Sequence, residues 1–523
     1  MQVVPYILYE VGYMGNTAND NLIIRICREH PYVATVFLCL IALIATGGQL
    51  GNTPALWILG AVLFVLIAAF AITLKVRNKL TFEASVVLIF MAGFALRLFY
   101  VLYTDLATRQ NDVGTFEEGV YNFYHSGYIL YVRDHMSLPS IDVREAGQFY
   151  HPPLHYIICA AFLKIYELFL RGGHNYEALQ ILTLCYAQIS SIAAYKILKL
   201  MGLKEDVLLP SCAILSFFPE FILLSGSINN DSLCTMLTFL AFYVALMWYR
   251  DGKLRNAAIS AVFAGLAMMT KLSAGLIAVP LAVLFIARFI KQEKVRTIGH
   301  AAVYGGIAIP LGLWFQVRNL ILFGVPLGYV LRSDNIYQDI SRFPVWQRLF
   351  GLYPVPIEDF FMNLGSDGQQ DYNTTIALIK SALFGEWNYR DSMAQSLPGY
   401  FLLWVFAALV IVSLAGGIYT IVTIRKRGLI AEELSLVALF AAELISYTAF
   451  ALKFPHICSM NFRYTVPLLI CGTYFAARIA SGRGRAVLAL KVLSIAFAVL
   501  SALFYILLAT YVMGEVEVVD VTW

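Results

Sequence analysis

Long apolar runs separated by short polar breaks repeat along nearly the whole chain. Each run is long enough to cross the hydrocarbon core of a bilayer as a helix, which takes roughly 17–25 residues. The pattern therefore predicts an all-α polytopic membrane protein with about 13 transmembrane helices. The candidate spans begin near Val33, Ala55, Ala84, Pro152, Glu177, Asp206, Ser232, Asn256, Ala274, Ala301, Pro398, Leu434, Arg463 and Ala489.

Three of these runs lie between His151 and Asp231, and the topology of this stretch stays open. If both residues face the same side, the chain between them must cross the membrane an even number of times. The run from Asp206 to Ser227 contains Pro210 and Pro219, and proline breaks the hydrogen-bond ladder of a span. Either this run enters and returns, or one of its neighbours lies flat on the membrane.

Two long polar stretches interrupt the apolar pattern, at residues 104–151 and 324–397. They divide the chain into an N-terminal transmembrane module (1–323), which contains the first loop, a second loop (324–397) and C-terminal transmembrane helices (398–523). The second loop also has apolar stretches, so we expect it to carry short helices that lie on the membrane face.

The charge distribution places both loops on one side. Hydrophobic residues make up 60% of the chain and charged residues 13%, which excludes an ordinary globular enzyme. Cytoplasmic loops carry an excess of Lys and Arg, and placing all the basic clusters inside puts both polar loops outside. These clusters are Arg25/Arg28, Lys75/Arg77/Lys79, Arg250/Lys253/Arg255, Lys291/Lys294/Arg296, Arg425/Lys426/Arg427 and Arg478/Arg483/Arg485.

The first loop is rich in acids, with seven carboxylates against three arginines between Asp105 and His151. Asp112 follows the end of a predicted span, where it could accept a proton from a hydroxyl nucleophile or hold a divalent cation. The alternative is that Asp112 caps a following helix. Glu117 and Glu118 would then lie one to two turns further along that helix.

Several charged residues stand at the predicted external ends of later spans. Lys271 violates the charge bias of that side, so it needs an anionic partner, either a ligand or Asp231. Arg318 and Arg463 follow the same logic, and together the three cations suggest a shared phosphate site. Helix capping accounts for only one residue of the Asn229–Asp231 group, Asp231 or Asn230.

The sequence HPPLHY begins at His151, where the first loop ends and an apolar run starts. Its prolines suit the first positions of a helix, because a residue there has no hydrogen-bond partner to lose. His151 and His155 lie one helical turn apart at the predicted water boundary. A polar interfacial role and a catalytic role remain open for both.

Together these motifs resemble the GT-C glycosyltransferases that use polyprenyl-phosphate sugars, in the branch of the protein O-mannosyltransferases and the aminoarabinose transferase of lipid A. The matching elements run in order along most of the chain. They are Asp112 in RQNDVG, HPPLHY, FFPEFILLSGSINND with Pro219 and Asp231, Thr270–Lys271, Arg318–Asn319 before Phe323–Gly324 and Pro326, and Arg463–Tyr464.

The resemblance implies a GT-C fold and a sugar donor that enters sideways from the bilayer, with an acceptor arriving from outside. Asp112 would activate the acceptor, assisted by Glu117 or Glu118. Lys271, Arg318 and Arg463 would bind the donor phosphate, and the supporting residues would be Asp231, His151, His155 and Asn230. The acceptor would be a glycan, a lipid or a protein, and the enzyme would lie in the plasma (inner) membrane with its site on the extracytoplasmic face.

Two other classes remain open from the sequence. A transporter or lipid flippase would use charges within its spans, for which Glu220 and Glu443 are the main candidates. A non-catalytic scaffold would leave the clustered polar motifs without a purpose. A divalent cation such as Mg²⁺ or Mn²⁺ is conceivable, but the eight cysteines show no metal-ligand spacing, and neither an organic cofactor nor nucleic acid is expected.

Overall fold

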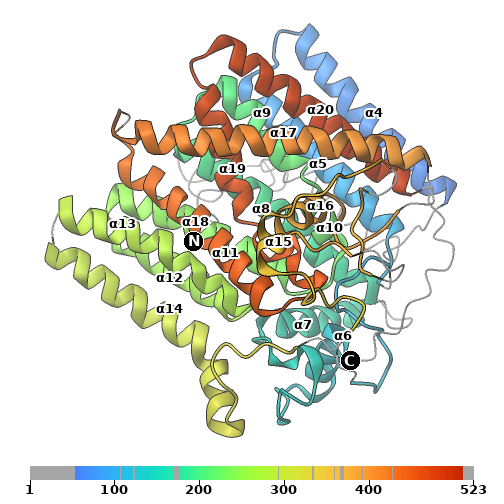
Figure 1. Ribbon diagram of the computed structural model, residues 1–523, viewed down its shortest axis with the longest axis vertical. Helices are drawn as coiled ribbons and strands as arrows, with labels where there is room; N and C mark the ends of the chain where they lie inside the picture. Colours follow the sequence, from blue (N-terminus) through green and yellow to red (C-terminus); the bar gives the residue numbers. More distant parts are fainter. Residues whose placement is uncertain are drawn as a thin grey trace, which may run out of the picture.

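The architecture comes from a computed structural model of residues 1–523. It describes the chain from residue 53 to 509, apart from residues 107, 122–123, 170–175, 292–293, 333–334, 358–359, 366–369, 390–392 and 427. The regular structure of the described residues is helical (Figure 1). They contain isolated β-bridges but no extended β-strand. The predicted all-α fold class is thereby confirmed.

The α-helices are α4 (Pro54–Val76), α5 (Phe82–Tyr103), α6 (His125–His135), α7 (Leu154–Phe169), α8 (Gln180–Leu200), α9 (Glu205–Ser216), α10 (Pro219–Gly226), α11 (Asp231–Asp251), α12 (Leu254–Met268), α13 (Ala278–Lys291), α14 (Lys294–Phe323), α15 (Val345–Phe350), α16 (Thr374–Phe384), α17 (Met393–Thr423), α18 (Ile430–Lys453), α19 (Leu468–Ala480) and α20 (Gly484–Leu508). Short 3₁₀ helices are η2 (Gly147–Tyr150), η3 (Tyr176–Leu179), η4 (Leu272–Ile277), η5 (Ile424–Lys426), η6 (Ile457–Met460) and η7 (Phe462–Tyr464).

Ten helical segments of the described chain are long and apolar enough to cross a membrane. The sequence predicted about 13 transmembrane helices from fourteen candidate runs. The candidate span near Val33 lies outside the described residues, and α12 and α19 are apolar but shorter than the others. The remaining difference is the run that begins near Pro152.

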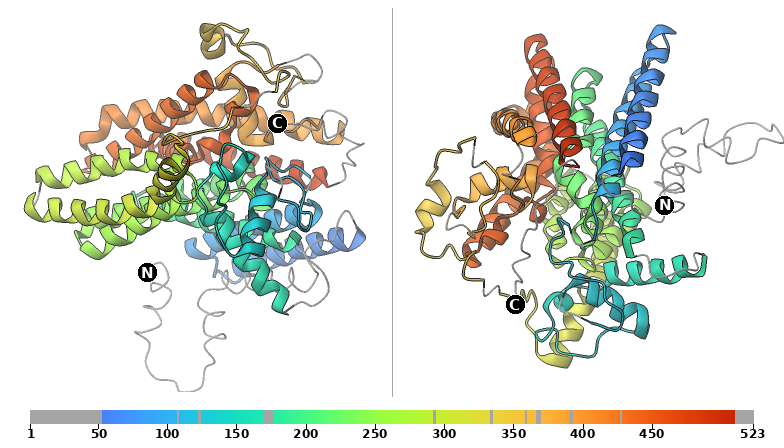
Figure 2. Two further views of the ribbon diagram at one scale, coloured as in Figure 1. Left: turned by 90° about the horizontal axis from the view of Figure 1, so that it is seen from below. Right: turned by 90° about the vertical axis from the view of Figure 1, so that its right-hand side faces the viewer.

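That run forms α7, a 16-residue helix that is not among the candidate spans. Figure 2, on the right, shows it running across the direction of α4 and α20. One side of α7 packs into the protein through Tyr156 and Leu163, whereas Leu168 and Phe169 are exposed. A two-sided helix that lies across the direction of the candidate spans is typical of the plane of a membrane interface, which favours the alternative of a flat neighbour.

The run from Asp206 to Ser227 is one candidate span broken into α9 and α10. Pro219 occupies the first turn of α10, where its missing N–H costs nothing. At the break, Arg97 of α5 donates to the carbonyl of Ser216 at 2.6 Å and to the side-chain oxygen of Gln188. The guanidinium thus satisfies a carbonyl that would otherwise be unpaired in an apolar environment.

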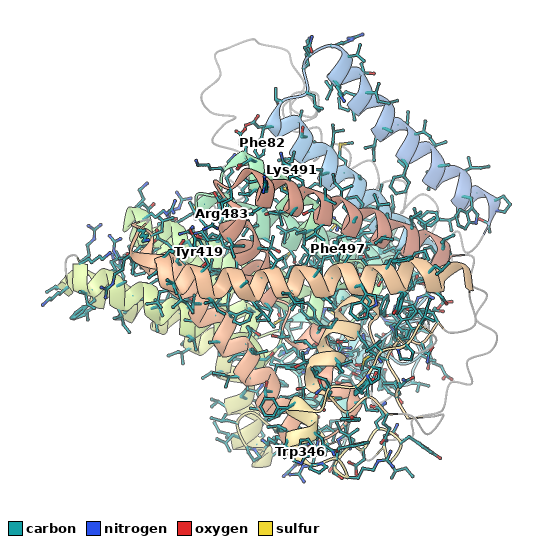
Figure 3. The ribbon with its side chains drawn as sticks, turned by 45° about the horizontal axis from the view of Figure 1, so that its top comes forward. Phe82, Trp346, Tyr419, Arg483, Lys491 and Phe497 are labelled. Carbon is teal, nitrogen blue, oxygen red and sulfur yellow. The ribbon has the colours of Figure 1, made fainter. Side chains whose placement is uncertain are left out.

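The spans pack in two groups that meet along the centre of the molecule. Helices α12, α13, α14 and α18 lie on one side in Figure 1, and α4, α5, α9 and α20 lie on the other. Helix α11 packs against α8 and α12, whereas α17 crosses over α19 and α20. Arg483 lies over the ring of Tyr419, and Figure 3 shows both far from Trp346, which belongs to the second polar stretch.

Both polar stretches hold short helices, α6 in the first and α15 and α16 in the second. Helix α16 is fastened by a fully buried ion pair, in which Lys380 Nζ lies 2.9 Å from Asp371 and also donates to the carbonyl of Phe361. Ser381 Oγ of α16 accepts from the backbone N–H of Phe462 at 2.9 Å. The second polar stretch is therefore tied directly to η7.

Candidate functional site

Arg463 lies at the centre of a cluster of charged side chains. The side-chain oxygen of Asn461 accepts from the backbone N–H of Arg463 at 2.8 Å and so begins the short helix η7. The Arg463 side chain is buried, with 5% of its surface exposed. Its guanidinium also packs on the ring of Tyr464 and donates to the Tyr464 hydroxyl at 2.9 Å.

Three carboxylates from distant parts of the chain surround this guanidinium. Nη2 lies 3.2 Å from Asp112 Oδ2, and Nη1 lies 3.5 Å from Asp231 Oδ2. Glu386 Oε1 lies further away, at 3.9 Å from Nη2. Burial alone would lower the pKa of Arg463, but Tyr464 and the carboxylates raise it well above the usual value, so the side chain stays charged.

Lys271 joins the cluster through Asp231. It stands between α12 and η4, and its Nζ forms an ion pair with Asp231 Oδ1. The ammonium also lies 4.7 Å from the centre of the Tyr464 ring. Asp231 thus holds Lys271 with one oxygen and Arg463 with the other, and Tyr464 lies between the two cations.

The local structure at Asp231 differs from the expected helix cap. Neither the side chain of Asp231 nor that of Asn230 caps α11; instead Asn229 Oδ1 accepts from the backbone N–H of Asp231. Asn230 Nδ2 donates to the carbonyl of Thr270 at 3.1 Å, which fixes the residue before Lys271. Asp231 itself lies in the first turn of α11, where the helix dipole favours a negative charge.

Asp112 does not cap a helix either, so that alternative is wrong. The described residues between Thr104 and Tyr124 form no helix, and Asp112 has a positive φ of 57°. Its carbonyl accepts from the backbone N–H of His125 at 3.1 Å, and the next carbonyl, of Val113, accepts from Ser126. The first turn of α6 therefore holds Asp112 in its left-handed conformation, which uses backbone hydrogen bonds to compensate a disfavoured geometry.

Glu117 and Glu118 lie apart from Arg463. Both are exposed and sit in a turn, and Glu118 forms an ion pair with Arg133 at 2.6 Å. No described contact joins either residue to Asp112.

His151 and His155 belong to an aromatic column beside Asp112. His151 stacks on His125, with ring centres 5.7 Å apart, and His125 Nδ1 lies 2.8 Å from the hydroxyl of Tyr156. Burial lowers the pKa of His125 to about 3, so this ring is neutral at physiological pH. His155 is fully buried in α7 against Cys159, and not at the water boundary that the sequence predicted.

Arg318 of α14 contacts a different part of the first polar stretch. Its guanidinium donates to the carbonyl of Pro139 at 2.7 Å and to the side chain of Asn319 at 2.9 Å. The described contacts of Arg318 include neither Asp112 nor Lys271. It therefore tethers the first stretch to α14 instead of joining the cluster around Arg463.

Glu386 and Asn461 complete the cluster and were not found from the sequence. Asn461 Nδ2 donates to Glu386 Oε1 at 2.8 Å, so one amide bridges the second polar stretch and Arg463. Burial raises the pKa of Glu386 above its usual value. Counting Asp112, Asp231 and Glu386 against Lys271 and Arg463 gives three carboxylates and two cations.

Within the part of the chain that is described, no group of three or more His, Cys, Asp or Glu residues could hold a metal ion. The cluster is instead an arrangement of alternating charges in which both cations are already paired with carboxylates. Such cations suit an anionic ligand that can exchange with the carboxylates, and a phosphate is one anion whose geometry matches an arginine fork.

The family model described as "Dolichyl-phosphate-mannose-protein mannosyltransferase" matches residues 150–314. This family belongs to the GT-C superfamily, and the matched stretch contains Asp231 and Lys271. The match supports a membrane glycosyltransferase of GT-C type. A comparison with curated proteins finds no match. The match agrees with the resemblance seen in the sequence, and the family that it names uses a polyprenyl-phosphate-linked sugar as donor.

Proposed function

We propose that this glycosyltransferase moves one sugar from a polyprenyl-phosphate donor to a glycan, lipid or protein on the extracytoplasmic face of the plasma membrane. One observation carries the proposal: Arg463 contacts both Asp112 and Asp231, and Asp231 also holds Lys271. A candidate base from the first polar stretch and two cations from span ends are thus neighbours in one cluster.

Lys271 and Arg463 bind the donor phosphate in this proposal. The phosphate oxygens take the place of Asp112 on Arg463, and the freed Asp112 carboxylate turns to the acceptor. The acceptor hydroxyl oxygen attacks the anomeric carbon, the bond from that carbon to the phosphate oxygen breaks, and the hydroxyl proton passes to Asp112. Polyprenyl phosphate leaves with the bonding electron pair, and the two cations stabilise the charge that develops on it.

Arg318 plays a different part from the one that the sequence suggested. Because its guanidinium is committed to Pro139, we place it outside the phosphate clamp, as the residue that anchors the first polar stretch. His125 and His151 shape the wall beside Asp112 through their stacked rings.

The proposed face of the site rests on charge and on chain parity. Two candidate spans, Tyr176–Leu200 and Glu205–Gly226, separate His151 from Asp231, and this even number supports placing both residues on one side of the membrane. The basic cluster near Lys75 lies at the end of α4, and the one near Lys253 follows the end of α11 that is remote from Asp231. Cytoplasmic segments are the ones enriched in Lys and Arg. This supports a site that faces away from the cytoplasm.

The test compares two matched Asp-to-Asn variants of the first polar stretch. Asp112→Asn should lower the rate of sugar transfer from a lipid-linked donor by about 10²–10⁴-fold, the usual contribution of a general base. Asp142→Asn is the control, because Asp142 is paired only with Arg144 at 2.5 Å. Near-normal transfer by a folded Asp112→Asn protein would remove the proposed base.

A second assay separates the enzyme from the transporter alternative. Purified protein in detergent should slowly hydrolyse a polyprenyl-phosphate sugar in the absence of acceptor, since water can replace the acceptor hydroxyl. A flippase would leave the donor intact.

A further inference from the structure

Glu386 is the one carboxylate of the cluster that makes no close hydrogen bond to a cation. It lies 3.9 Å from Arg463 Nη2, beyond hydrogen-bonding distance, and its side chain is 12% exposed. It accepts a hydrogen bond from a neutral group, the amide of Asn461. Asp231, by contrast, is an ion-pair partner of both Lys271 and Arg463.

The backbone conformation at Gly385 sets the direction in which the chain reaches Glu386. Gly385 ends α16 with φ 64° and ψ −145°, a conformation that is essentially restricted to glycine. A Cβ at Gly385 would also come within 3.0 Å of the Trp387 ring and 3.2 Å of Leu223. A sharp turn therefore sends the chain from α16 towards Arg463.

The element that carries Glu386 is itself held rigidly. The ion pair between Lys380 and Asp371 fastens α16 to the segment that precedes it, and the Ser381 hydroxyl accepts from the Phe462 N–H one residue before Arg463. Glu386 and Arg463 are therefore positioned against one another from both sides. The two anchors of α16 and the glycine-restricted turn together fix the position of Glu386 relative to Arg463.

We propose that Glu386 is a positioning residue that occupies the place of the donor phosphate beside Arg463 until the donor arrives. This inference rests on the proposed function, since it assumes that Arg463 binds the donor phosphate. It assigns to the second polar stretch a direct part in donor binding.

The charge balance explains why a carboxylate must give way. The cluster already has one carboxylate more than it has cations, so an incoming phosphate adds to an excess of negative charge in a poorly solvated place. Asp231 cannot leave without stranding Lys271, and Asp112, although it releases Arg463 in the proposed reaction, stays in the site as a charged base. Glu386 can move away or take up a proton, and its burial favours the protonated form.

The experiment measures binding of polyprenyl phosphate, without any sugar, to the purified full-length protein in nanodiscs. Glu386→Gln keeps a side-chain oxygen for the Asn461 amide but removes the charge. We expect it to bind polyprenyl phosphate roughly three- to tenfold more tightly than the unaltered protein, because one repulsive charge near the phosphate is gone. Asp142→Asn should bind as the unaltered protein does.

The pH dependence adds a readout that a purely structural role would not change. In the unaltered protein binding should weaken as the pH rises through the pKa of Glu386, and in Glu386→Gln this part of the dependence should disappear. The other titratable or charged groups facing Glu386 are Asp112, Glu220, Asp231, Cys458, Arg463 and Tyr464, and all of them are unchanged in this variant.

The outcomes separate the inference from the proposed function. If Lys271→Ala weakens binding but Glu386→Gln has the affinity and pH profile of the unaltered protein, the role of Glu386 is overturned while the phosphate clamp stands. If the unaltered protein binds no polyprenyl phosphate, the clamp itself fails. Weaker binding by a correctly folded Glu386→Gln protein would also overturn the inference, because it would make Glu386 a donor contact and not a placeholder.

Discussion

Arg463 Nη2 lies 3.2 Å from Asp112 Oδ2, although 351 residues separate the two along the chain. The contact joins the first polar stretch to the segment just before α19. Because Arg463 also contacts Asp231, it joins the first polar stretch, the start of α11 and the segment before α19 through charged groups. Arg463 is therefore both a structural link and the centre of the proposed phosphate clamp.

Removing this link should destabilise the protein strongly. Arg463→Ala leaves the buried Asp231 with Lys271 alone and leaves Asp112 without its cation, and breaking a buried ion pair costs about 3–5 kcal/mol. The effect is measured by heating the protein in detergent and recording the fraction that remains monodisperse. Arg144→Ala is the control, since Arg144 forms an exposed pair with Asp142 that is worth about 0–1 kcal/mol.

Arg463→Lys tests the fork geometry separately from the charge. An ammonium at the end of a lysine chain is a point charge and cannot present two nitrogens to Asp112 and Asp231 at once. We expect a stable protein whose KM for the lipid-linked donor rises by about tenfold or more. An unchanged donor KM would show that the guanidinium is not a donor contact.

The sequence exposed much of this cluster because a charge at the end of an apolar run is conspicuous. Asp231, Lys271 and Arg463 all stand in such places, and each is in the cluster. Glu386 could not be found in this way, because it lies in a polar stretch where an acid has no contrast with its surroundings. Its signal is the left-handed glycine before it, and such a backbone conformation is visible only in a structure.

Two other differences have equally local causes. Arg318 has the sequence context of Lys271, but a backbone carbonyl, Pro139, satisfies its guanidinium. The run after Pro152 is apolar enough to suggest a span, yet His155 and the buried side of α7 require protein contact along only one side. Hydropathy reports that a segment avoids water, and it does not report the direction in which the helix runs.

Lys271→Ala should weaken donor binding far more than acceptor binding. The substitution removes one cation of the proposed clamp and leaves Asp231 with Arg463. We expect the donor Kd to rise at least tenfold while the acceptor KM changes less than twofold, as measured in separate titrations. Lys253→Ala is the control, because this exposed lysine pairs with Asp251 at the far end of α11. Equal effects on donor and acceptor would argue against a phosphate contact.

The proposed orientation in the membrane can be tested by cysteine labelling. Ser140 is exposed in the first polar stretch, and Lys253 lies in the basic turn between α11 and α12. Each is replaced by cysteine in turn. In intact cells or right-side-out vesicles, a membrane-impermeant maleimide should label Ser140→Cys at once and Lys253→Cys only after permeabilisation. The unaltered chain supplies the background, and of its six described cysteines four are buried. The reverse pattern would place the site on the cytoplasmic face.

Gly385→Ala should tighten the binding of polyprenyl phosphate without any change in the charged residues. An alanine Cβ disfavours the backbone conformation at this position and approaches Trp387, which costs about 1–3 kcal/mol. We expect the chain to relieve this strain by turning Glu386 away from Arg463. Gly482→Ala is the matched control, because Gly482 also has a positive φ, 78°, but open space around it and a place at the basic end of α19. Both variants should lose some thermal stability, whereas only Gly385→Ala should alter the affinity for polyprenyl phosphate and its pH dependence. Identical donor binding by the two variants would show that the turn before Glu386 serves folding alone, and the second polar stretch would then have no direct part in the site.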